Sequence, residues 1–511
     1  MSLRLGAARS RQLQTSARLG VLAGTAALAV VLLSLIPPDG ILSANEEDYF
    51  ALAARFVSGS VWPETTAVFD SSRHRMLSDA TLGGTISLIG YAPAQVLTRL
   101  FAVVGYTLVL PRLFGAFALS AVDAALVVMT MSLIGQDIVG GEWLFGDYEA
   151  KVAAYILVLS ALRLVLTKER LTTAALLSVS ATYFHFLVGG FWFVAVMALR
   201  LLDRRDLRHV ATTAFLYTLL VAPLLVIIIR SRLADDSAAL ATDVPSPDVI
   251  YSIIREPHHQ SPFLSWSYFR DYWLPGYLMA VPMLLSCIWV ARNAPSHRLR
   301  VTGWWLAGLL TYLFLVLGPK FLDRSTGILG KFYLFRPSSL IEFLWLMLAL
   351  AFAVNIAGHR AWLMRVALLA TIGPAFCYVQ GGRLMREVAT PPFAGEKTLI
   401  VNAVQRLASA GDVVLIDPDA EADWLDFERR TGRPTWVAWK FAPTNDAELI
   451  TWYRRIEARA ATFSQGCGAD LGLARQTFLL ATAATAYRLS SSCGPELIRA
   501  GPWVLLRTTP G

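Results

Sequence analysis

The sequence predicts a polytopic α-helical membrane protein with a small α/β domain at its C-terminal end, and three observations lead to this fold class. The 511 residues are 55% apolar and only 16% charged, with a mean hydropathy of +0.52. Soluble domains carry about 25% charged residues, so this chain is too poor in charge to be one of them. The other two observations are a series of apolar runs before residue 382 and a change of character after it. We expect a transmembrane domain over 1–382 and a second domain over 383–511.

A transmembrane helix needs about 20 mostly apolar residues, and runs close to this length predict about eleven spans. They cover residues 19–36, 84–104, 112–134, 150–166, 170–185, 187–202, 210–229, 274–292, 302–317, 338–357 and 364–381. The first run follows several arginines and has features of a signal peptide. It is longer than a usual signal-peptide core, and no small-residue cleavage site follows it. We therefore interpret it as a retained first helix with a cytoplasmic N-terminus.

The basic residues agree with this orientation. Loops that the register places in the cytoplasm are short and basic, as the positive-inside rule requires; they contain Lys168, Arg170, Arg200, Arg204, Arg205, Arg208, Arg292, Arg298, Arg300, Arg360 and Arg365. The longer loops, about 37–83, 135–149, 230–273 and 318–337, then lie outside, as does the C-terminal domain. We expect a bacterial plasma (inner) membrane protein, and the net charge of +8 indicates membrane orientation rather than nucleic-acid binding.

The tail alternates predicted helices and strands, which favours a small α/β domain with a mainly parallel sheet. Helices are expected over 396–410, 420–430 and 447–460, and strands over 412–417, 434–440, 486–490 and 502–508. Neither a G-x-G-x-x-G nor a P-loop pattern is present, so nothing indicates a nucleotide site. Cys467 and Cys493 can form a disulfide if the tail lies outside the cytoplasm. Cys287 and Cys377 lie in apolar runs and are expected to be small core residues.

Two acidic clusters fall in the predicted outer loops. Glu46, Glu47 and Asp48 follow the first span and could supply a general base or metal ligands at the membrane surface. The alternative is a solvated charge run at the start of a helix, where acidic residues are favourable. Asp147 and Glu149 offer two carboxylates to one cation, or a base and an orienting acid, unless they only cap the fourth span.

Three further clusters carry cationic or titratable groups. Lys151 follows the second acidic cluster, and its cation could face a carboxylate or a phosphate. His185 lies between two short apolar runs, where it is either a core residue or a functional group. The longest outer loop contains Arg255, His258 and His259, which suit phosphate binding, proton transfer or metal ligation, or form an ordinary polar loop. Adjacent histidines tend to diverge, so one chelate from both is not expected.

Arg336 begins the tenth span from the outer side. Its guanidinium is placed to bind a lipid phosphate at headgroup depth, or to act as an interfacial anchor beside aromatic residues. All five clusters therefore fall on one side of the membrane, carboxylates early in the chain and cations late. Transfer of a group from an anionic lipid phosphate requires this combination of a base and cations on the leaving group.

These features resemble the GT-C superfamily of membrane glycosyltransferases, which includes oligosaccharyltransferase subunits and polyprenyl-phosphate-sugar mannosyltransferases. The resemblance lies in the acidic segment 45–49 after the first span, the second acidic motif at 147–149 and the C-terminal domain. The patterns around Glu149-Ala-Lys151, His185, 255–259, 433–440 and 451–455 are similar to a narrower group of uncharacterised bacterial GT-C-like proteins.

The resemblance implies an inverting transfer of a sugar from a polyprenyl-(pyro)phosphate donor to an acceptor on the extracytoplasmic face. It implies that Glu46 or Asp48 is the general base, and that Arg336 holds the donor phosphate with help from Arg255, His258 or His259. The second acidic motif binds a divalent cation (Mg or Mn) in oligosaccharyltransferases, but Lys151 departs from that pattern and disfavours a metal. Contacts on the acceptor side would come from the tail, at Arg433, Trp439 and Lys440.

Two functions of other classes stay open at this point. A transporter or flippase for an anionic lipid or glycan would need polar residues near the membrane midplane and broken helices in two matching halves. A non-catalytic membrane assembly protein would use the tail to recruit a partner and would not need the carboxylates. The sugar, the acceptor and the oligomeric state are not encoded in any motif.

Overall fold

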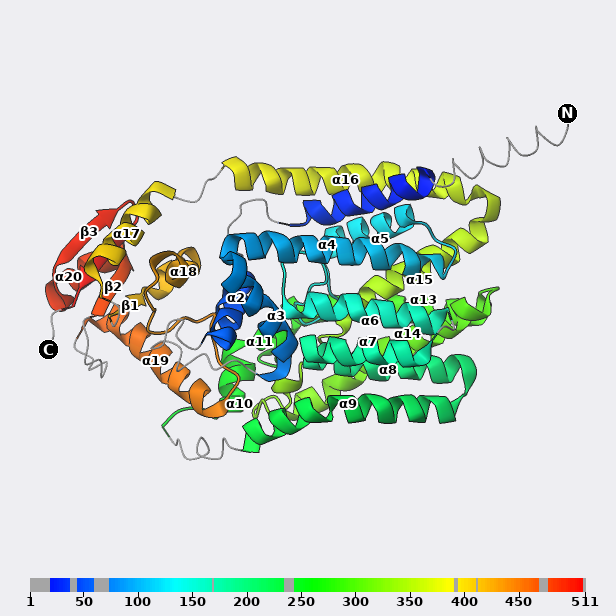
Figure 1. Ribbon diagram of the computed structural model, residues 1–511, viewed down its shortest axis with the longest axis horizontal. Helices are drawn as coiled ribbons and strands as arrows, with labels where there is room; N and C mark the ends of the chain where they lie inside the picture. Colours follow the sequence, from blue (N-terminus) through cyan, green and yellow to red (C-terminus); the bar gives the residue numbers. More distant parts are fainter. Residues whose placement is uncertain are drawn as a thin grey trace.

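The computed structural model describes residues 19–36, 44–58, 73–167, 170–233, 243–389, 394–409, 412–467 and 477–508. Long helices run side by side and form a bundle, and a small domain with a sheet lies at one end of it (Figure 1). We call the end of the bundle that faces this domain the domain end, and the opposite end the far end. The C-terminal tail and the described parts of the predicted outer loops lie at the domain end.

The bundle consists of a first helix, Leu19–Ser34, followed by α4–α9 and α13–α16. Their bounds are α4 Tyr91–Gly115, α5 Ala121–Ile134, α6 Ala150–Leu166, α7 Leu171–Phe184, α8 Phe186–Arg204, α9 Leu207–Leu233, α13 Leu274–Asn293, α14 His297–Leu322, α15 Ser338–Ala357 and α16 Ala361–Ala389. Each predicted span overlaps one of these helices. In the described chain, six helical stretches are long and apolar enough to cross a membrane. The others are shorter, such as α5 with 14 residues, so the full number of spans stays a prediction.

Shorter elements lie at the domain end. They are α2 Ala44–Val57, η2 Arg73–Arg75, α3 Met76–Ile89, α10 Pro247–Val249, the π-helical η4 Ile250–Arg255, α11 Pro257–Gln260, α12 Trp266–Tyr268, the π-helical η5 Phe269–Trp273 and η6 Gly330–Phe332. A single 3₁₀ turn, η7 Gly358–Arg360, joins α15 to α16.

The predicted boundaries of the second and third spans were wrong. The run 84–104 crosses Gly90, where φ is +82° and α3 ends, and the spanning helix α4 begins at the next residue. The run 112–134 includes the end of α4, and α5 begins only at Ala121, capped by the Ser120 side chain. Apolar residues continue through both turns, so hydropathy alone did not show where the chain reverses.

A tight turn at His185 joins α7 and α8, as the sequence predicted. His185 is extended (φ −152°, ψ 103°), and its ring lies at the start of α8. Gly189 lies one turn further along α8, and a Cβ there would overlap the backbone of Thr182 in α7. The absence of a side chain at Gly189 lets the two helices pack closely, so His185 is held at the domain end.

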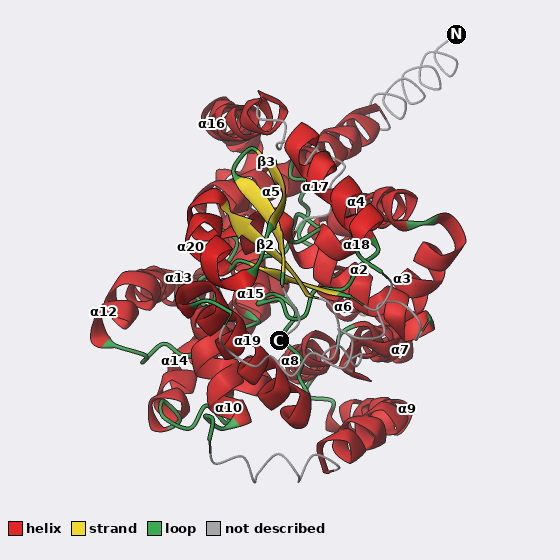
Figure 2. Cartoon of the chain, turned by 90° about the vertical axis from the view of Figure 1, so that its left-hand side faces the viewer, coloured by secondary structure: helices red, strands yellow, loops and turns green. Residues whose placement is uncertain are grey.

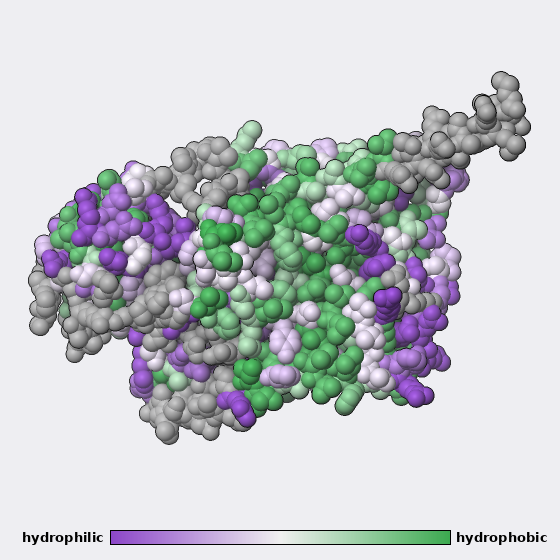
Figure 3. Space-filling view, viewed as in Figure 1, coloured by the Kyte–Doolittle hydropathy of each residue, from purple (hydrophilic) through white to green (hydrophobic). Residues whose placement is uncertain are grey.

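The surface of the bundle is apolar around its middle and hydrophilic at the far end, as Figure 3 shows. Exposed leucines, valines, phenylalanines and tryptophans occur along α4, α9, α13 and α16. In water such a continuous apolar surface would be unfavourable, whereas in a lipid bilayer it is solvated by acyl chains. The chain is therefore an integral membrane protein. Cys377 is part of this exposed surface, so its expected core position was wrong, while Cys287 is buried.

The C-terminal domain has a four-stranded sheet covered by helices. Its elements are α17 Ala394–Leu407, β1 Val413–Ile416, η8 Pro418–Trp424, α18 Phe427–Thr431, α19 Asp446–Gln465, β2 Thr477–Thr482, α20 Ala483–Cys493, β3 Glu496–Ala500 and β4 Trp503–Arg507. The strand order is β1-β2-β4-β3. Figure 2 views the molecule from the domain end and shows this sheet over the ends of the bundle helices.

Several predictions for this domain were wrong. Only β1 and β2 pair in parallel, and the other two pairs are antiparallel, so the sheet is not mainly parallel. Residues 434–440 form one isolated bridge, Thr435 to Val414, instead of a strand. Residues 486–490 lie in α20, and the helix expected over 420–430 is divided between η8 and α18. Strand β2 was not predicted, because its residues are buried on both faces and show no alternation.

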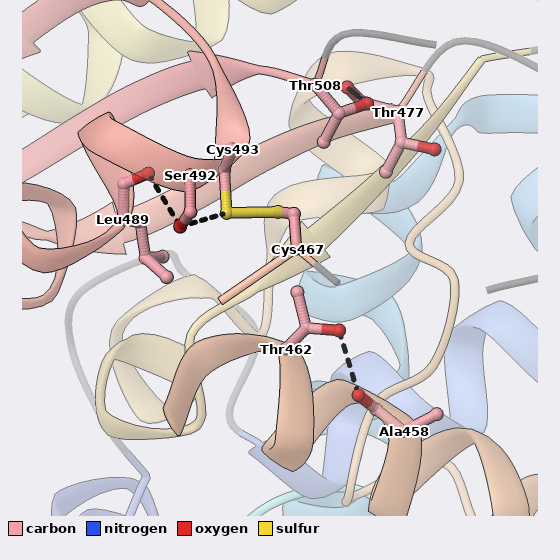
Figure 4. The surroundings of a disulfide bond; sticks show 8 residues. All are labelled: Ala458, Thr462, Cys467, Thr477, Leu489, Ser492, Cys493 and Thr508. Atoms are coloured by element: carbon pink, nitrogen blue, oxygen red, sulfur yellow. Dashed lines mark hydrogen bonds between the residues drawn. A yellow bond between two sulfur atoms is a disulfide. The ribbon is translucent and has the colours of Figure 1, made fainter. Parts of the chain in front are cut away.

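Cys467 and Cys493 form a disulfide, which joins the residues after α19 to the end of α20 (Figure 4). The disulfide that the sequence analysis considered possible is therefore present. The two cysteines are 26 positions apart in the sequence, and β2 lies between them.

Candidate active site

Polar side chains from five separate segments meet where the bundle faces the C-terminal domain. The segments are α2, the loop between α5 and α6, the turn at His185, the stretch from η4 to α11, and the loop before α15; α2, α10 and α11 lie between bundle and domain in Figure 1. The five clusters from the sequence analysis therefore lie at one end of the molecule.

Glu46 joins α2 to α4. Its carboxylate is fully buried and accepts hydrogen bonds from Arg99 Nε at 2.9 Å and Nη2 at 2.6 Å. Gln95 Nε2 and the backbone N–H of Tyr148 also donate to it, both at 3.2 Å. A carboxylate with this many fixed donors anchors structure, and its lone pairs are not directed toward open space.

Glu47, the next residue, joins α2 to the C-terminal domain. Arg429 in α18 donates from Nη2 to Glu47 Oε1 at 2.7 Å and from Nε to both carboxylate oxygens at 3.0 and 3.1 Å. Asn45 makes a second connection, because its side-chain oxygen accepts a hydrogen bond from Lys440. The start of α2 is therefore fixed against both parts of the chain.

Asp48 differs from its two neighbours. Within the described residues it forms no hydrogen bond and no ion pair within 4.0 Å, and its side chain is only partly buried. Burial raises the pKa of Asp48 above its ordinary value, against the opposing effect of Arg75, Lys440 and Arg255 nearby. Of the three consecutive carboxylates, Asp48 is the one without a hydrogen-bond or ion-pair partner among the described residues.

A compact charge network lies around Glu142, in the loop before α6. Lys151 Nζ is 2.8 Å from Glu142 Oε2 and 3.3 Å from Glu149 Oε2, and Arg336 Nε is 2.8 Å from Glu142 Oε1. Burial alone would raise the pKa of Glu142, but Arg336 and Lys151 hold it well below its usual range. Glu142 therefore stays ionised and fixes both cations.

Arg336 connects this network to the turn at His185. Its Nη1 lies 2.9 Å from His185 Nε2, and its guanidinium stacks on the ring of Tyr333 at 3.9 Å from the centroid. Since a guanidinium has no acceptor, it donates to Nε2. The other ring nitrogen, Nδ1, accepts a hydrogen bond from the backbone N–H of Val188 at 3.4 Å, which caps the start of α8. His185 thus acts as an orienting partner of Arg336.

Arg255 lies at the border with the C-terminal domain. It pairs with Glu256 at 3.3 Å, donates to the Lys440 carbonyl at 3.2 Å, and lies over the Trp439 ring at 5.7 Å. Of the predicted tail contacts, Trp439 and Lys440 reach the site. Arg433 instead donates to the Ala408 carbonyl at 2.9 Å, inside the C-terminal domain.

His258 and His259 do not diverge, contrary to expectation. Their ring centroids are 4.0 Å apart, because α11 is a single turn and both rings lie over Gly141 of the neighbouring loop. His259 Nε2 is 3.4 Å from Glu256 Oε2. Among the described residues, these two histidines and Glu256 form a group of three potential metal ligands.

The second acidic motif is divided between two environments. Glu149 pairs with Lys151 as described, whereas Asp147 is half-buried in the preceding turn. A divalent cation between these carboxylates would lie beside the Lys151 ammonium. The donor set of Asp147 and Glu149 therefore does not fit the metal that the resemblance implied.

An apolar cavity of about 250 Å³ adjoins the charge network. Its lining is mainly aromatic and aliphatic, and Arg336 contributes the charged group; the residues are Phe186, Leu187, Val188, Gly190, Phe191, Trp192, Tyr312, Phe332, Tyr333, Leu334, Arg336 and Pro337. The cavity thus places apolar walls next to a fixed guanidinium.

Several residues of this site were not identified from the sequence. Glu142 lies in a predicted outer loop but outside both acidic clusters, five residues from Asp137 and from Asp147. Arg75 pairs with Asp79 at 3.2 Å and lies over the Tyr49 ring, and Arg99 lies within a span. The signal that could have found Arg99 is its charge in an apolar run, since a buried cation requires a partner.

Comparisons with known proteins agree with the fold. A family profile described as "Domain of unknown function (DUF6798)" matches residues 399–459. No curated protein matches the chain. The crystal structure of ArnT from Cupriavidus metallidurans bound to undecaprenyl phosphate is similar over 96% of this chain and 99% of its own, with a TM-score of 0.51 and 12% identity. The apo structure of the same protein covers 97% and 100%, with a TM-score of 0.44 and 12% identity.

The first of these structures shows that the chain shares the fold of that ArnT along nearly its whole length. At 12% identity it shows the fold alone. The chemistry must be argued from the residues of this chain.

Proposed function

We propose that this protein is an inverting glycosyltransferase. It transfers a sugar from a polyprenyl-(pyro)phosphate donor to an acceptor hydroxyl on the extracytoplasmic face of the bacterial plasma membrane. The observation that carries the proposal is the position of Asp48, an unpaired carboxylate at the domain end, in the same cluster as Arg255, Lys440, Glu149 and the Lys151 network. The ArnT structure with the same fold holds undecaprenyl phosphate, which supports a lipid-phosphate donor.

Each half of the reaction has a candidate group. Asp48 accepts the proton of the acceptor hydroxyl, whose oxygen attacks the anomeric carbon of the donor. The bond from that carbon to the phosphate oxygen breaks on the opposite face, so the configuration is inverted. The electron pair departs with the polyprenyl phosphate, and Arg336 and Lys151 stabilise the developing charge. The acceptor then enters from the side of Trp439 and Lys440.

The apolar cavity supports the same donor class. An isoprenoid chain needs apolar walls, and its phosphate needs a cation at the membrane surface. Arg336 lines the cavity and uses only two of its five N–H groups in the bonds to Glu142 and His185 that occur in the described structure. The remaining N–H groups suit the oxygens of a phosphate. Because Asp147 and Glu149 do not fit a metal, Arg336 and Lys151 take the role of stabilising the phosphate charge in the proposal.

The test is a transfer assay with the full chain in detergent and a panel of radiolabelled polyprenyl-monophosphate sugars. We expect release of polyprenyl phosphate by the unmodified protein, and a loss of about 10²–10⁴-fold in Asp48→Asn, the range for removal of a general base. Asp206→Asn, which changes an exposed carboxylate at the far end, is the matched control and should keep full activity. Unimpaired transfer by Asp48→Asn would refute the assignment of the base.

A further inference from the structure

A second site lies beside the proposed transfer site, at Glu256, His258 and His259. One potential ligand atom from each residue lies within 4.8 Å of the other two. All three belong to one short stretch at the start of α11. The proposed transfer reaction makes no use of this group. The metal that the resemblance implied would have bound elsewhere, at Asp147 and Glu149, although the sequence left metal ligation open for His258 and His259.

The hydrogen bonding of His259 leaves a lone pair directed at a carboxylate. Its Nδ1 contacts the Gly140 carbonyl oxygen, which can only accept, so Nδ1 carries the proton. The Nε2 of a neutral ring is then an acceptor, and it faces Glu256 Oε2 at 3.4 Å. Two acceptors that face each other at this separation leave room for a bridging hydrogen-bond proton or a metal ion between them.

The separation favours the metal. A charge-assisted hydrogen bond from an imidazolium to a carboxylate spans about 2.7–2.9 Å. Two ligands at about 2.1 Å from a tetrahedral zinc ion are about 3.4 Å apart. A backbone carbonyl that holds the remote ring N–H is also the usual outer partner of a metal-bound histidine.

The surroundings keep the three ligands in place and leave one direction open. Gly141 has a φ of +63°, and both imidazole rings lie 3.5 Å from the position that a Cβ would take there. Glu256 is held by Arg255 through its other carboxylate oxygen, at 3.3 Å. His258 is exposed, so a fourth ligand can approach from solvent.

We propose that Glu256, His258 and His259 bind a transition-metal ion of the zinc type, with an open fourth position. Two imidazole nitrogens and one carboxylate oxygen suit zinc and its neighbours, whereas Mg²⁺ prefers six oxygen ligands. All three ligands come from one stretch, and the hydrogen bond of His259 to the Gly140 carbonyl joins this stretch to the loop that carries Glu142. The metal site is a site of its own and does not depend on the proposed transfer reaction.

The test measures zinc on the full chain in detergent, by equilibrium dialysis with elemental analysis. We expect one zinc per chain, retained in a large excess of Mg²⁺. His258→Ala should weaken binding by more than about 100-fold, beyond the 10–100-fold effect of losing an outer-sphere partner. Because His258 is exposed, this variant keeps the packing of the site. His359→Ala, at an exposed histidine of η7, is the matched control and should bind as the unmodified protein does.

Cobalt gives an independent reading, since tetrahedral Co²⁺ absorbs strongly in the visible range and octahedral Co²⁺ does not. The unmodified protein should give the tetrahedral spectrum, and Glu256→Gln should lose it while melting at a similar temperature without metal. Absence of zinc from the unmodified protein, displacement by Mg²⁺, or equal binding by His258→Ala and His359→Ala would each overturn the proposal.

Discussion

The two ends of the bundle hold their charges in different ways. At the domain end, ion pairs are buried and join distant segments: Glu46 is fully buried against Arg99, and Lys151 and Glu142 expose 6% and 2% of their side chains. At the far end, Asp206 and His209 are three residues apart and expose 31% and 72%. His297 and Asp203 are also partly exposed, at 57% and 14%. Arg365 and the buried Asp123, close to the starts of α16 and α5, form an exception, because this pair lies toward the far end and joins distant segments.

This difference indicates what each set of charges does. Burying an ion pair costs several kcal/mol of desolvation for each ion, so a fold retains one only where its geometry is needed. Exposed pairs contribute about 0–1 kcal/mol and need no fixed geometry. The buried pairs of the domain end therefore fix the relative positions of side chains from distant segments, whereas the exposed pairs at the far end do not.

The largest effect is expected from Arg336. Arg336→Gln removes the guanidinium from the mouth of the apolar cavity and should lower kcat by about 10²–10³-fold, the range for a lost charge-stabilising donor. Arg336→Lys should recover only part of this loss, because an ammonium cannot reproduce the fork that contacts Glu142 and His185. Transfer assays check both, and Arg204→Gln at the far end is the control. Equal activity of Arg336→Gln and Arg204→Gln would show that charges at the domain end matter no more for transfer than charges at the far end.

Substitution of Glu46 should mainly lower the free energy of unfolding. Glu46→Gln removes the carboxylate that pairs with the buried Arg99 guanidinium, and loss of one partner of a buried pair costs about 3–5 kcal/mol. Unfolding in detergent, followed by circular dichroism, measures the change. The double variant Glu46→Leu with Arg99→Leu should recover most of it, because no uncompensated charge remains. A double variant less stable than Glu46→Gln would contradict this account.

The pH dependence should follow Asp48. The base acts only when ionised, and its pKa is raised, so activity is lost as the pH falls through a value above the about 3.9 of an ordinary aspartate. Below that value kcat/KM should fall about tenfold for each pH unit. A pH–rate profile with an acid limb at or below the ordinary value would argue against Asp48 as the base.

The smallest effect is expected at the far end. Asp206→Asn removes the exposed pair with His209 and should change the free energy of unfolding by no more than about 1 kcal/mol. Thermal unfolding in the same detergent checks it. A loss comparable to that of Glu46→Gln would show that exposure does not separate the two ends.

The sequence predicted the helices of the bundle better than the contacts of the site. Apolar runs located α6, α8 and α15 closely, because a membrane requires long apolar helices. The ion-pair partners of the charged residues in the site could not be predicted in the same way. Glu142 and Arg336 are separated by 194 residues, and Glu47 and Arg429 by 382, and no local pattern encodes such pairs. In the C-terminal domain, residues 434–440 are apolar like a strand but lie beside the sheet with one bridge, which only the tertiary packing decides.

The three consecutive carboxylates of α2 also fix the rotation of this helix about its own axis. Successive residues of an α-helix point about 100° apart around its axis. Glu46, Glu47 and Asp48 therefore face the bundle, the C-terminal domain and the open site in turn. One residue inserted ahead of Glu46 would turn all three by that angle and disconnect them together. The direction in which Asp48 points from α2 is therefore fixed by two ion pairs, Glu46–Arg99 and Glu47–Arg429.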